Sequence, residues 1–123
     1  MLQKLDHLVI TTAHMEECLA FYRALGFTAR DAGGRWELFC GDFKINVHYL
    51  GSELHPHAGQ VQPGSADLCF ELAVPLADCR RALLAAGLAV ELGPVARTGV
   101  RGAMQSVYLR DPDGNLVELC SYL

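Results

Sequence analysis

The chain has 123 residues, of which 51% are hydrophobic, and a formal charge of −4 at pH 7. This length and composition predict one globular domain with a single core. Basic and acidic residues are scattered along the chain rather than gathered into runs. This pattern argues against nucleic acid and against an anionic membrane surface as partners.

The N-terminal segment and the cysteines indicate a cytoplasmic protein. Asp6 and His7 interrupt the first apolar run before it could act as a signal sequence, and no later segment has the length and apolarity of a membrane span. The five cysteines are odd in number, widely spaced and without a C-x-x-C pair, which argues against a disulfide framework and a zinc ribbon. We therefore expect free thiols in a reducing compartment.

The first 50 residues predict a strand, a helix and three further strands. Apolar residues recur at helical spacing between residues 14 and 25, with Thr12 as the expected N-cap and Gly26 as the expected stop. Gly33-Gly34 and Gly41-Asp42 are turn signals that separate the later strands. The expected strands are Leu5–Thr11, Phe27–Asp31, Trp36–Cys40 and Phe43–Leu50.

The same order of elements follows a linker rich in glycine and proline, Gly51–Ser65. Pro75 opens the second expected helix, and Gly87 ends it. The expected strands of this half are Asp67–Val74, Ala89–Val95, Met104–Arg110 and Asn115–Tyr122, and residues 97–102 are expected to form a loop.

Two segments show that the halves are related. C-L-A-F-Y-R-A-L-G-F from Cys18 and C-R-R-A-L-L-A-A-G-L from Cys79 align with the cysteine and the glycine in register. A small sheet with one helix leaves its other face in need of a partner, so two such halves pair favourably. The sequence thus predicts a single domain of the α+β class, residues 1–123. It consists of two tandem βαβββ modules, residues 1–50 and 66–123, whose curved mixed sheet encloses a cup for a metal and a substrate.

Strand alternation places four potential metal ligands on the inner face of this cup, because alternate side chains of a strand share a face. They are His7, His48, Asp67 and Glu118. Carboxylates at such positions are costly unless they are paired or bound to metal, and two carboxylates with two imidazoles suit a divalent cation. A hydrogen-bonded network of histidine and carboxylate without metal is the alternative.

Other residues are candidates for substrate contact. Ser106 and Tyr108 share one face of their strand, where Tyr108 either binds or protonates a substrate or serves only in packing. Asn46 also faces the cup. Arg97 and Arg101 lie in a loop punctuated by glycines and could pair with an anionic group, although an ordinary solvated connection explains them nearly as well.

Three further features are expected to be structural. His55-Pro56-His57 lies in a loop and is expected to be exposed rather than to bind metal. Cys69 and Cys120 face the cup and are expected to line its wall rather than act as nucleophiles. The turn at residues 111–115, D-P-D-G-N, should join a hairpin and thereby set the face that Glu118 presents.

Several motifs together resemble the vicinal oxygen chelate superfamily, which includes glyoxalases, bleomycin-resistance proteins and dioxygenases. They are D-H-L-V-I at residues 6–10, F-Y-R-A-L-G-F at 21–27 and R-D-P-D-G-N-L-V-E-L at 110–119. The segments K-I-N-V-H, P-G-S-A-D-L-C-F and G-P-V-A-R-T-G are closest to small glyoxalase domain-containing proteins, the group labelled glyoxalase domain-containing protein 5. The resemblance covers essentially the whole chain.

The resemblance implies one divalent metal held by the four residues named above. Nitrogen and carboxylate ligands without a thiolate favour manganese or iron(II), followed by nickel or zinc. The resemblance also implies a homodimer in which a site often takes ligands from both chains. Asp67 stands where many members have histidine, which disfavours extradiol dioxygenase chemistry. The implied function is a lyase or isomerase of the glyoxalase type, or a transferase that modifies a small molecule with adjacent oxygens; Glu118 and Tyr108 would be the catalytic residues. The alternatives are a metal-free drug-binding protein of the bleomycin-resistance kind and an extradiol-type dioxygenase.

Overall fold

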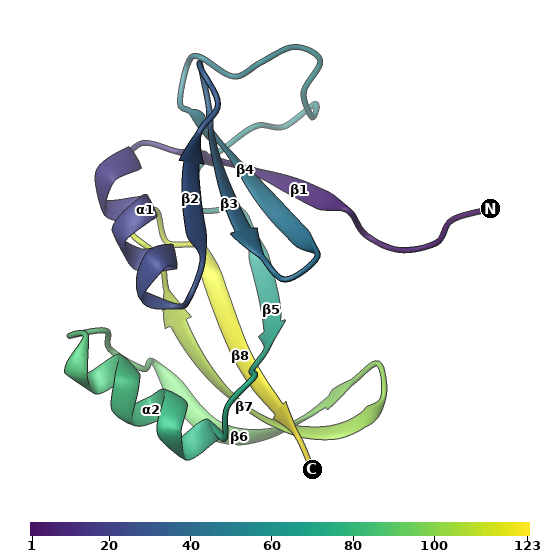
Figure 1. Cartoon of the computed structure of the whole chain (residues 1–123), viewed down its shortest axis with the longest axis vertical. Coiled ribbons are helices and arrows are strands. Elements are labelled where there is room, and N and C mark those ends of the chain that lie inside the picture. The colour runs from purple at the N-terminus through teal and green to yellow at the C-terminus, as the bar shows by residue number, and fades with distance from the viewer. The chain divides into compact units, whose positions relative to one another are not determined.

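The computed structural model of the chain describes residues 1–123 and confirms the two predicted βαβββ modules (Figure 1). The chain forms two compact units, one from Met1–Ser65 with Pro112–Gly114 and the other from Ala66–Asp111 with Asn115–Leu123. The unit boundary at residue 65 coincides with the end of the predicted linker. Neither helix is long and apolar enough to cross a membrane.

The first unit contains one helix and a four-stranded mixed sheet in the order β1-β4-β3-β2, in which β1 and β4 are parallel. Its elements are β1 (His7–Thr12), α1 (Met15–Ala24), β2 (Thr28–Asp31), β3 (Trp36–Cys40) and β4 (Phe43–Tyr49). Tyr22 of the helix packs edge-on against Phe27, and Phe27 packs in the same way against Phe43. Phe43 shares its face of β4 with the fully buried Ile45 and Val47, so this face carries the core.

The second unit repeats this plan with a sheet in the order β5-β8-β7-β6, in which β5 and β8 are parallel. Its elements are β5 (Asp67–Glu71), α2 (Leu76–Ala85), β6 (Leu92–Gly99), β7 (Gly102–Arg110) and β8 (Leu116–Tyr122). Val107, Leu109, Val117 and Leu119 form one buried face of the two long strands. The opposite face carries Tyr108 and Glu118.

Two local expectations are wrong. Thr12 does not cap α1: it is still a strand residue, His14 occupies the cap position without a side-chain hydrogen bond, and the Thr12 hydroxyl donates to Asp113 instead. Arg97 does not lie in a loop, because β6 extends to Gly99 and pairs with β7 down to Gly102. The pairing of β6 with β7 is irregular between Leu92 and Val95. This irregularity breaks the alternation of side chains, and the strand was therefore predicted too early, at Ala89–Val95.

The buried face of the first sheet provides a stability test. Leu38 is 0% exposed, whereas Leu84 on α2 is 81% exposed. We expect Leu38→Ala to lower the free energy of unfolding by about 2–5 kcal/mol, because it removes buried methyl groups and leaves a cavity. Leu84→Ala is the matched control and should change stability by no more than about 0.5 kcal/mol. Urea denaturation measures both, and equal effects would contradict this assignment of the core.

Candidate functional site

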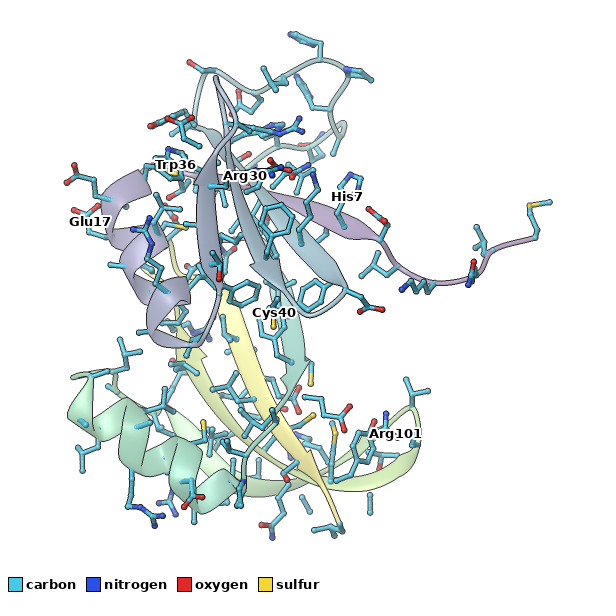
Figure 2. The ribbon with its side chains drawn as sticks, in the orientation of Figure 1. His7, Glu17, Arg30, Trp36, Cys40 and Arg101 are labelled. Atoms are coloured by element: carbon cyan, nitrogen blue, oxygen red, sulfur yellow. The ribbon has the colours of Figure 1, made fainter.

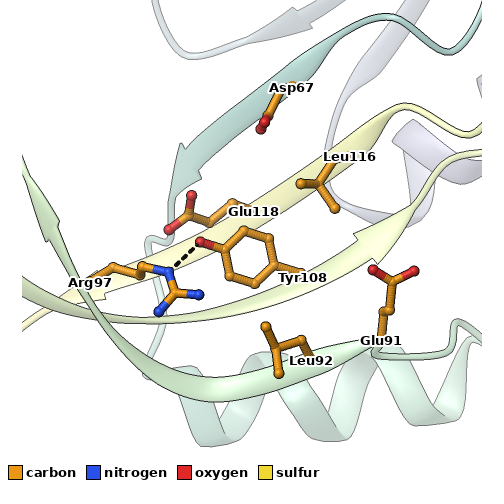
Figure 3. Close-up of a pocket in the computed structure, with 7 residues that line it drawn as sticks. All are labelled: Asp67, Glu91, Leu92, Arg97, Tyr108, Leu116 and Glu118. Carbon is orange, nitrogen blue, oxygen red and sulfur yellow. Dashed lines mark hydrogen bonds between the residues drawn. The ribbon is translucent and has the colours of Figure 1, made fainter.

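A cavity of about 340 Å³ lies on the inner face of the second unit (Figure 3). Four of its lining residues were identified from the sequence: Asp67, Arg97, Tyr108 and Glu118. The others are Glu91, Leu92 and Leu116. These three carry no clear signal in the sequence. Glu91 and Leu92 lie where β6 begins, three residues later than the expected strand, and Leu116 is an ordinary apolar strand residue.

Strand register explains why these side chains meet. Glu118 of β8 lies directly between Cys69 of β5 and Tyr108 of β7, and Tyr108 is paired in turn with Leu92 of β6. Paired residues of neighbouring strands point to the same face of a sheet. Each of the four strands therefore contributes one side chain to a row that crosses the inner face of the sheet.

Tyr108 and Arg97 form a fixed pair in this cavity (Figure 3). The Arg97 Nε–H donates to the Tyr108 hydroxyl oxygen at 2.8 Å, and Arg97 Nη1 donates to the carbonyl oxygen of Ala96 at 2.9 Å. The guanidinium carbon lies 5.3 Å from the centre of the Tyr108 ring. Arg97 thus holds the hydroxyl in place and leaves Nη2 available to an anionic ligand.

Glu118 has an unused hydrogen-bonding atom at the cavity. Its Oε1 atom is buried and has no hydrogen-bond partner, and the same is true of the Ser106 hydroxyl. A buried acceptor without a partner costs about 1–3 kcal/mol, and more when it is charged. A cation or a proton donor in the cavity would offset this cost, so the carboxylate of Glu118 fits a metal ligand.

Cys69 lies next to Glu118 but is not placed as a nucleophile. Burial raises the pKa of the Cys69 thiol to about 12, with further contributions from Cys120 and Glu118. A thiol with such a pKa stays protonated at neutral pH, and the thiolate is the reactive form. This favours the expectation that Cys69 does not act as a nucleophile, although neither Cys69 nor Cys120 is among the residues that line this cavity.

Arg101 is not among the cavity residues. It lies in the turn between β6 and β7 (Figure 2), where Nη2 donates to Glu71 Oε1 at 2.5 Å. Its guanidinium also stacks 4.1 Å from the centre of the Tyr122 ring. Of the two arginines expected to contact a substrate, only Arg97 reaches the cavity.

His7 and His48 share a face of the first sheet but lie far apart along it. His7 of β1 is paired with Lys44 of β4, whereas His48 is paired with Thr11. Four residues of a parallel strand span about 13 Å. Because two nitrogens on one metal ion lie only about 4 Å apart, these two histidines of one chain do not bind the same ion.

The two histidines also differ in their hydrogen bonds. His7 Nδ1 lies 2.8 Å from Asp6 Oδ1, an arrangement in which Nδ1 carries the proton of a neutral ring and the Nε2 lone pair is free. Figure 2 shows the position of His7. This pairing with a carboxylate is typical of metal-binding histidines. His48 Nδ1 instead accepts a hydrogen bond of 3.4 Å from the backbone N–H of Leu54, which leaves the proton of a neutral ring on Nε2. These hydrogen bonds favour His7 over His48 as a metal ligand.

The four predicted metal ligands are divided between the units, His7 and His48 in the first and Asp67 and Glu118 in the second. Nowhere in the chain do three or more His, Cys, Asp or Glu side chains gather in an arrangement that could hold a metal ion.

The two histidines of the His55-Pro56-His57 loop are exposed, as expected. The centres of their rings lie 4.7 Å apart.

Glu37 is a buried charge on the inner face of the first sheet that the sequence did not single out. Its side chain is 5% exposed and pairs with Lys44 and with Arg30, whose Nη2 donates to Oε1 at 2.8 Å. Hydrogen bonds from Lys44 and then from Arg30 lower the pKa of Glu37 to about 2. The strand alternation of β3 gives the only signal for it, because Glu37 faces opposite to Leu38.

The Glu37 pair predicts a pH dependence of stability. Because its pKa in the folded chain lies below the ordinary value of 4.5, its contribution is present above that value and is lost as the pH falls through about 2. Glu37→Gln should therefore be less stable than the natural chain at pH 7, and the gap should narrow by pH 2.5. Denaturant unfolding at both values measures the gap, with the exposed Glu17→Gln as control. A gap of constant size would disprove the pairing.

Comparison with known proteins identifies the family. The Glyoxalase/Bleomycin resistance protein/Dioxygenase superfamily matches residues 4–119, and the chain belongs to this superfamily. This agrees with the resemblance carried by the motifs of both halves.

Individual relatives extend over the whole chain. Glyoxalase domain-containing protein RDO1 of Mycosarcoma maydis is 47% identical over 98% of this chain and 69% of its own length. Virulence protein STM3117 of Salmonella typhimurium is 42% identical over 99% of this chain and 86% of its own, and its crystal structure matches with a TM-score of 0.96 over 100% of this chain and 99% of that one. Lactoylglutathione lyase of Agrobacterium tumefaciens has the same fold, with a TM-score of 0.75 at 20% identity over 98% of this chain and 95% of that one.

Proposed function

We propose that this protein is a metal-dependent enzyme that acts on a small substrate with adjacent oxygens, as a lyase or isomerase of the glyoxalase type or as a transferase. The observation that carries this proposal is the unpartnered, buried Glu118 Oε1 beside Asp67 and Tyr108 in one cavity. Membership in the superfamily and the name of the 47% identical relative support it.

The proposed metal ligands are His7, Asp67 and Glu118. Asp6 would orient His7, since carboxylates that accept from a ligating histidine fix its ring. Two carboxylates and one imidazole suit manganese or iron(II) first, with nickel or zinc as further candidates. Such a metal would polarise two adjacent substrate oxygens and stabilise negative charge that develops on them.

The protein's own residues would do the rest of the chemistry. The Tyr108 hydroxyl, which accepts a hydrogen bond from Arg97 Nε–H, would donate one to a substrate oxygen. Arg97 Nη2 would pair with an anionic group. The carboxylate of Glu118 would take a proton from the carbon next to the chelated oxygens.

We further propose a homodimer whose metal site takes His7 from one chain and the two carboxylates from the other. One observation supports it: His7 belongs to the first unit, whereas Asp67 and Glu118 belong to the second. The five free cysteines fit a reducing compartment, so the cytoplasm is the proposed location.

The apolar part of the cavity favours a second function, metal-free sequestration of a drug. The cavity contains one aromatic ring and two leucines, which such a ligand would contact. Tight binding of an aromatic drug without metal and without turnover would establish it.

Metal binding is the direct test of the enzyme proposal. Untagged protein should take up about one manganese or iron(II) ion per chain, measured by elemental analysis after dialysis. Glu118→Gln and His7→Ala should lose this ion, and Asp6→Asn should weaken its affinity about 10- to 100-fold.

Two matched controls are available for this test. Glu91→Gln changes a carboxylate of the same cavity that pairs with Arg110, and His55→Ala changes an exposed loop histidine. Both variants should bind metal as the natural chain does. Uptake that survives Glu118→Gln would refute the proposed ligand set.

Sharing of the site between chains has its own test. A heterodimer of His7→Ala and Glu118→Ala chains would contain one intact site and one doubly altered site if ligands come from both chains. We expect half of the natural metal content in purified heterodimers and none in either variant homodimer. Heterodimers that bind no metal, or a monomer in light scattering at micromolar concentration, would exclude sharing.

A further inference from the structure

Two buried polar side chains on one face of β4 in the first unit each have a polar atom without a hydrogen-bond partner. Asn46 is 4% exposed and His48 is 5% exposed, and the alternation of β4 places both on the face away from Ile45 and Val47. Asn46 Oδ1 and His48 Nε2 have no hydrogen-bond partner. Unpartnered buried polar atoms are uncommon in folded proteins and call for an explanation.

His48 presents a hydrogen-bond donor at this place. Its Nδ1 accepts from the Leu54 backbone N–H at 3.4 Å, so the neutral ring carries its proton on Nε2. Burial lowers the pKa of His48, followed by the charge of Arg35, and both keep the ring neutral at pH 7. The unpartnered Nε2–H therefore points to a missing acceptor.

Arg35 supplies a second donor next to the first. Arg35 directly precedes Trp36, which is paired with Val47 in the antiparallel ladder, and the charge of Arg35 acts on His48. The Nε–H of Arg35 is buried and has no partner. Two N–H groups without a partner, Arg35 Nε–H and His48 Nε2–H, thus lie at the same end of the sheet, together with the guanidinium charge.

No carboxylate of the unit fills this place. Glu37, on the same face, is occupied by Lys44 and Arg30. The charge of Glu53 raises the pKa of His48, but Glu53 Oε1 already accepts a hydrogen bond from the Gly51 backbone N–H at 3.0 Å. An anion from outside the chain would give Arg35 Nε–H and His48 Nε2–H the acceptor that they lack.

We propose that Arg35 and His48 form a binding site for a small oxyanion, a carboxylate or a phosphoryl group, and that Asn46 accepts a hydrogen bond from a neighbouring hydroxyl of the same ligand. The donors Arg35 Nε–H and His48 Nε2–H bind the oxyanion, and Asn46 Oδ1 distinguishes a hydroxylated ligand from a plain one. The site goes beyond the proposed metal function and does not need the metal, so metal-free protein suffices to test it.

The test is a titration of EDTA-treated, full-length protein with acetate, glycolate, methylphosphonate and neutral acetamide, followed by NMR of the ¹⁵N-labelled histidine rings. We expect the oxyanions to bind at least about tenfold more tightly than acetamide and to shift the Nε2–H signal of His48. The comparison of carboxylates with methylphosphonate decides which oxyanion the site prefers. Glycolate should bind more tightly than acetate.

Variants distinguish the contributions of Arg35, Asn46 and His48 to oxyanion binding. Arg35→Gln should weaken binding of every oxyanion about tenfold or more, whereas Arg30→Gln, which changes an arginine occupied by Glu37, should not. Asn46→Leu should remove the advantage of glycolate over acetate and leave acetate binding unchanged. His48→Phe should weaken oxyanion binding, with the exposed His57→Phe as control; if His48→Phe does not fold, the ring spectrum of the natural chain still reports the tautomer.

Three results would overturn the site: a His48 ring protonated on Nδ1, acetamide binding as tight as that of the oxyanions, or unchanged affinity in Arg35→Gln. Oxyanion binding that requires metal would also overturn it while leaving the metal proposal intact. Conversely, oxyanion binding in a protein that takes up no metal would support this site and remove the metal proposal.

Discussion

The hydrogen bonds of Asn115 determine the register on which the cavity of the second unit depends. This residue is 1% exposed, and its backbone N–H and side-chain amide donate to the carboxylate of Asp111 at 3.0 and 2.7 Å. Its Oδ1 accepts from the backbone N–H of Ala66 at 2.9 Å, just before β5 begins. One side chain thereby aligns β5, β7 and β8. A slip of one residue would turn Tyr108 and Glu118 to the opposite face.

Both units bury polar groups on the sheet face that does not carry the core. The unpartnered atoms include Asn46 Oδ1 and His48 Nε2 in the first unit and Ser106 Oγ and Glu118 Oε1 in the second. Apolar residues of similar size at these positions would avoid a cost of about 1–3 kcal/mol for each group. The pattern is expected of a protein whose inner faces are arranged for a ligand rather than for stability alone.

His7 and His48 illustrate how hydrogen bonding assigns different chemistry to the same residue type. Asp6 beside Nδ1 makes the remaining nitrogen of His7 a lone-pair donor suited to a metal. The Leu54 N–H beside Nδ1 makes the remaining nitrogen of His48 a proton donor suited to an anion. The chemistry of each ring is set by the partner of its other nitrogen, and these partners come from different parts of the chain.

The sequence by itself determined the element types, the repeat of two βαβββ modules and the face on which Asp67, Tyr108 and Glu118 lie, because hydrophobic alternation and turn residues are local signals. The D-P-D-G-N sequence likewise predicted the turn of the hairpin that the last two strands form. Family membership followed from motifs that extend over both halves.

Tertiary structure alone decided how far apart His7 and His48 lie, where Arg97 sits and which atoms lack partners. Alternation reveals the face of a residue but not its position along a neighbouring strand, which depends on the register of β1 against β4. Alternation also failed to predict the bounds of β6, because the irregular pairing near Gly93 breaks the two-residue period of the side chains. The tautomer of His48 depends on a backbone N–H six residues away, a contact that only folding brings about because the chain must turn back on itself to form it.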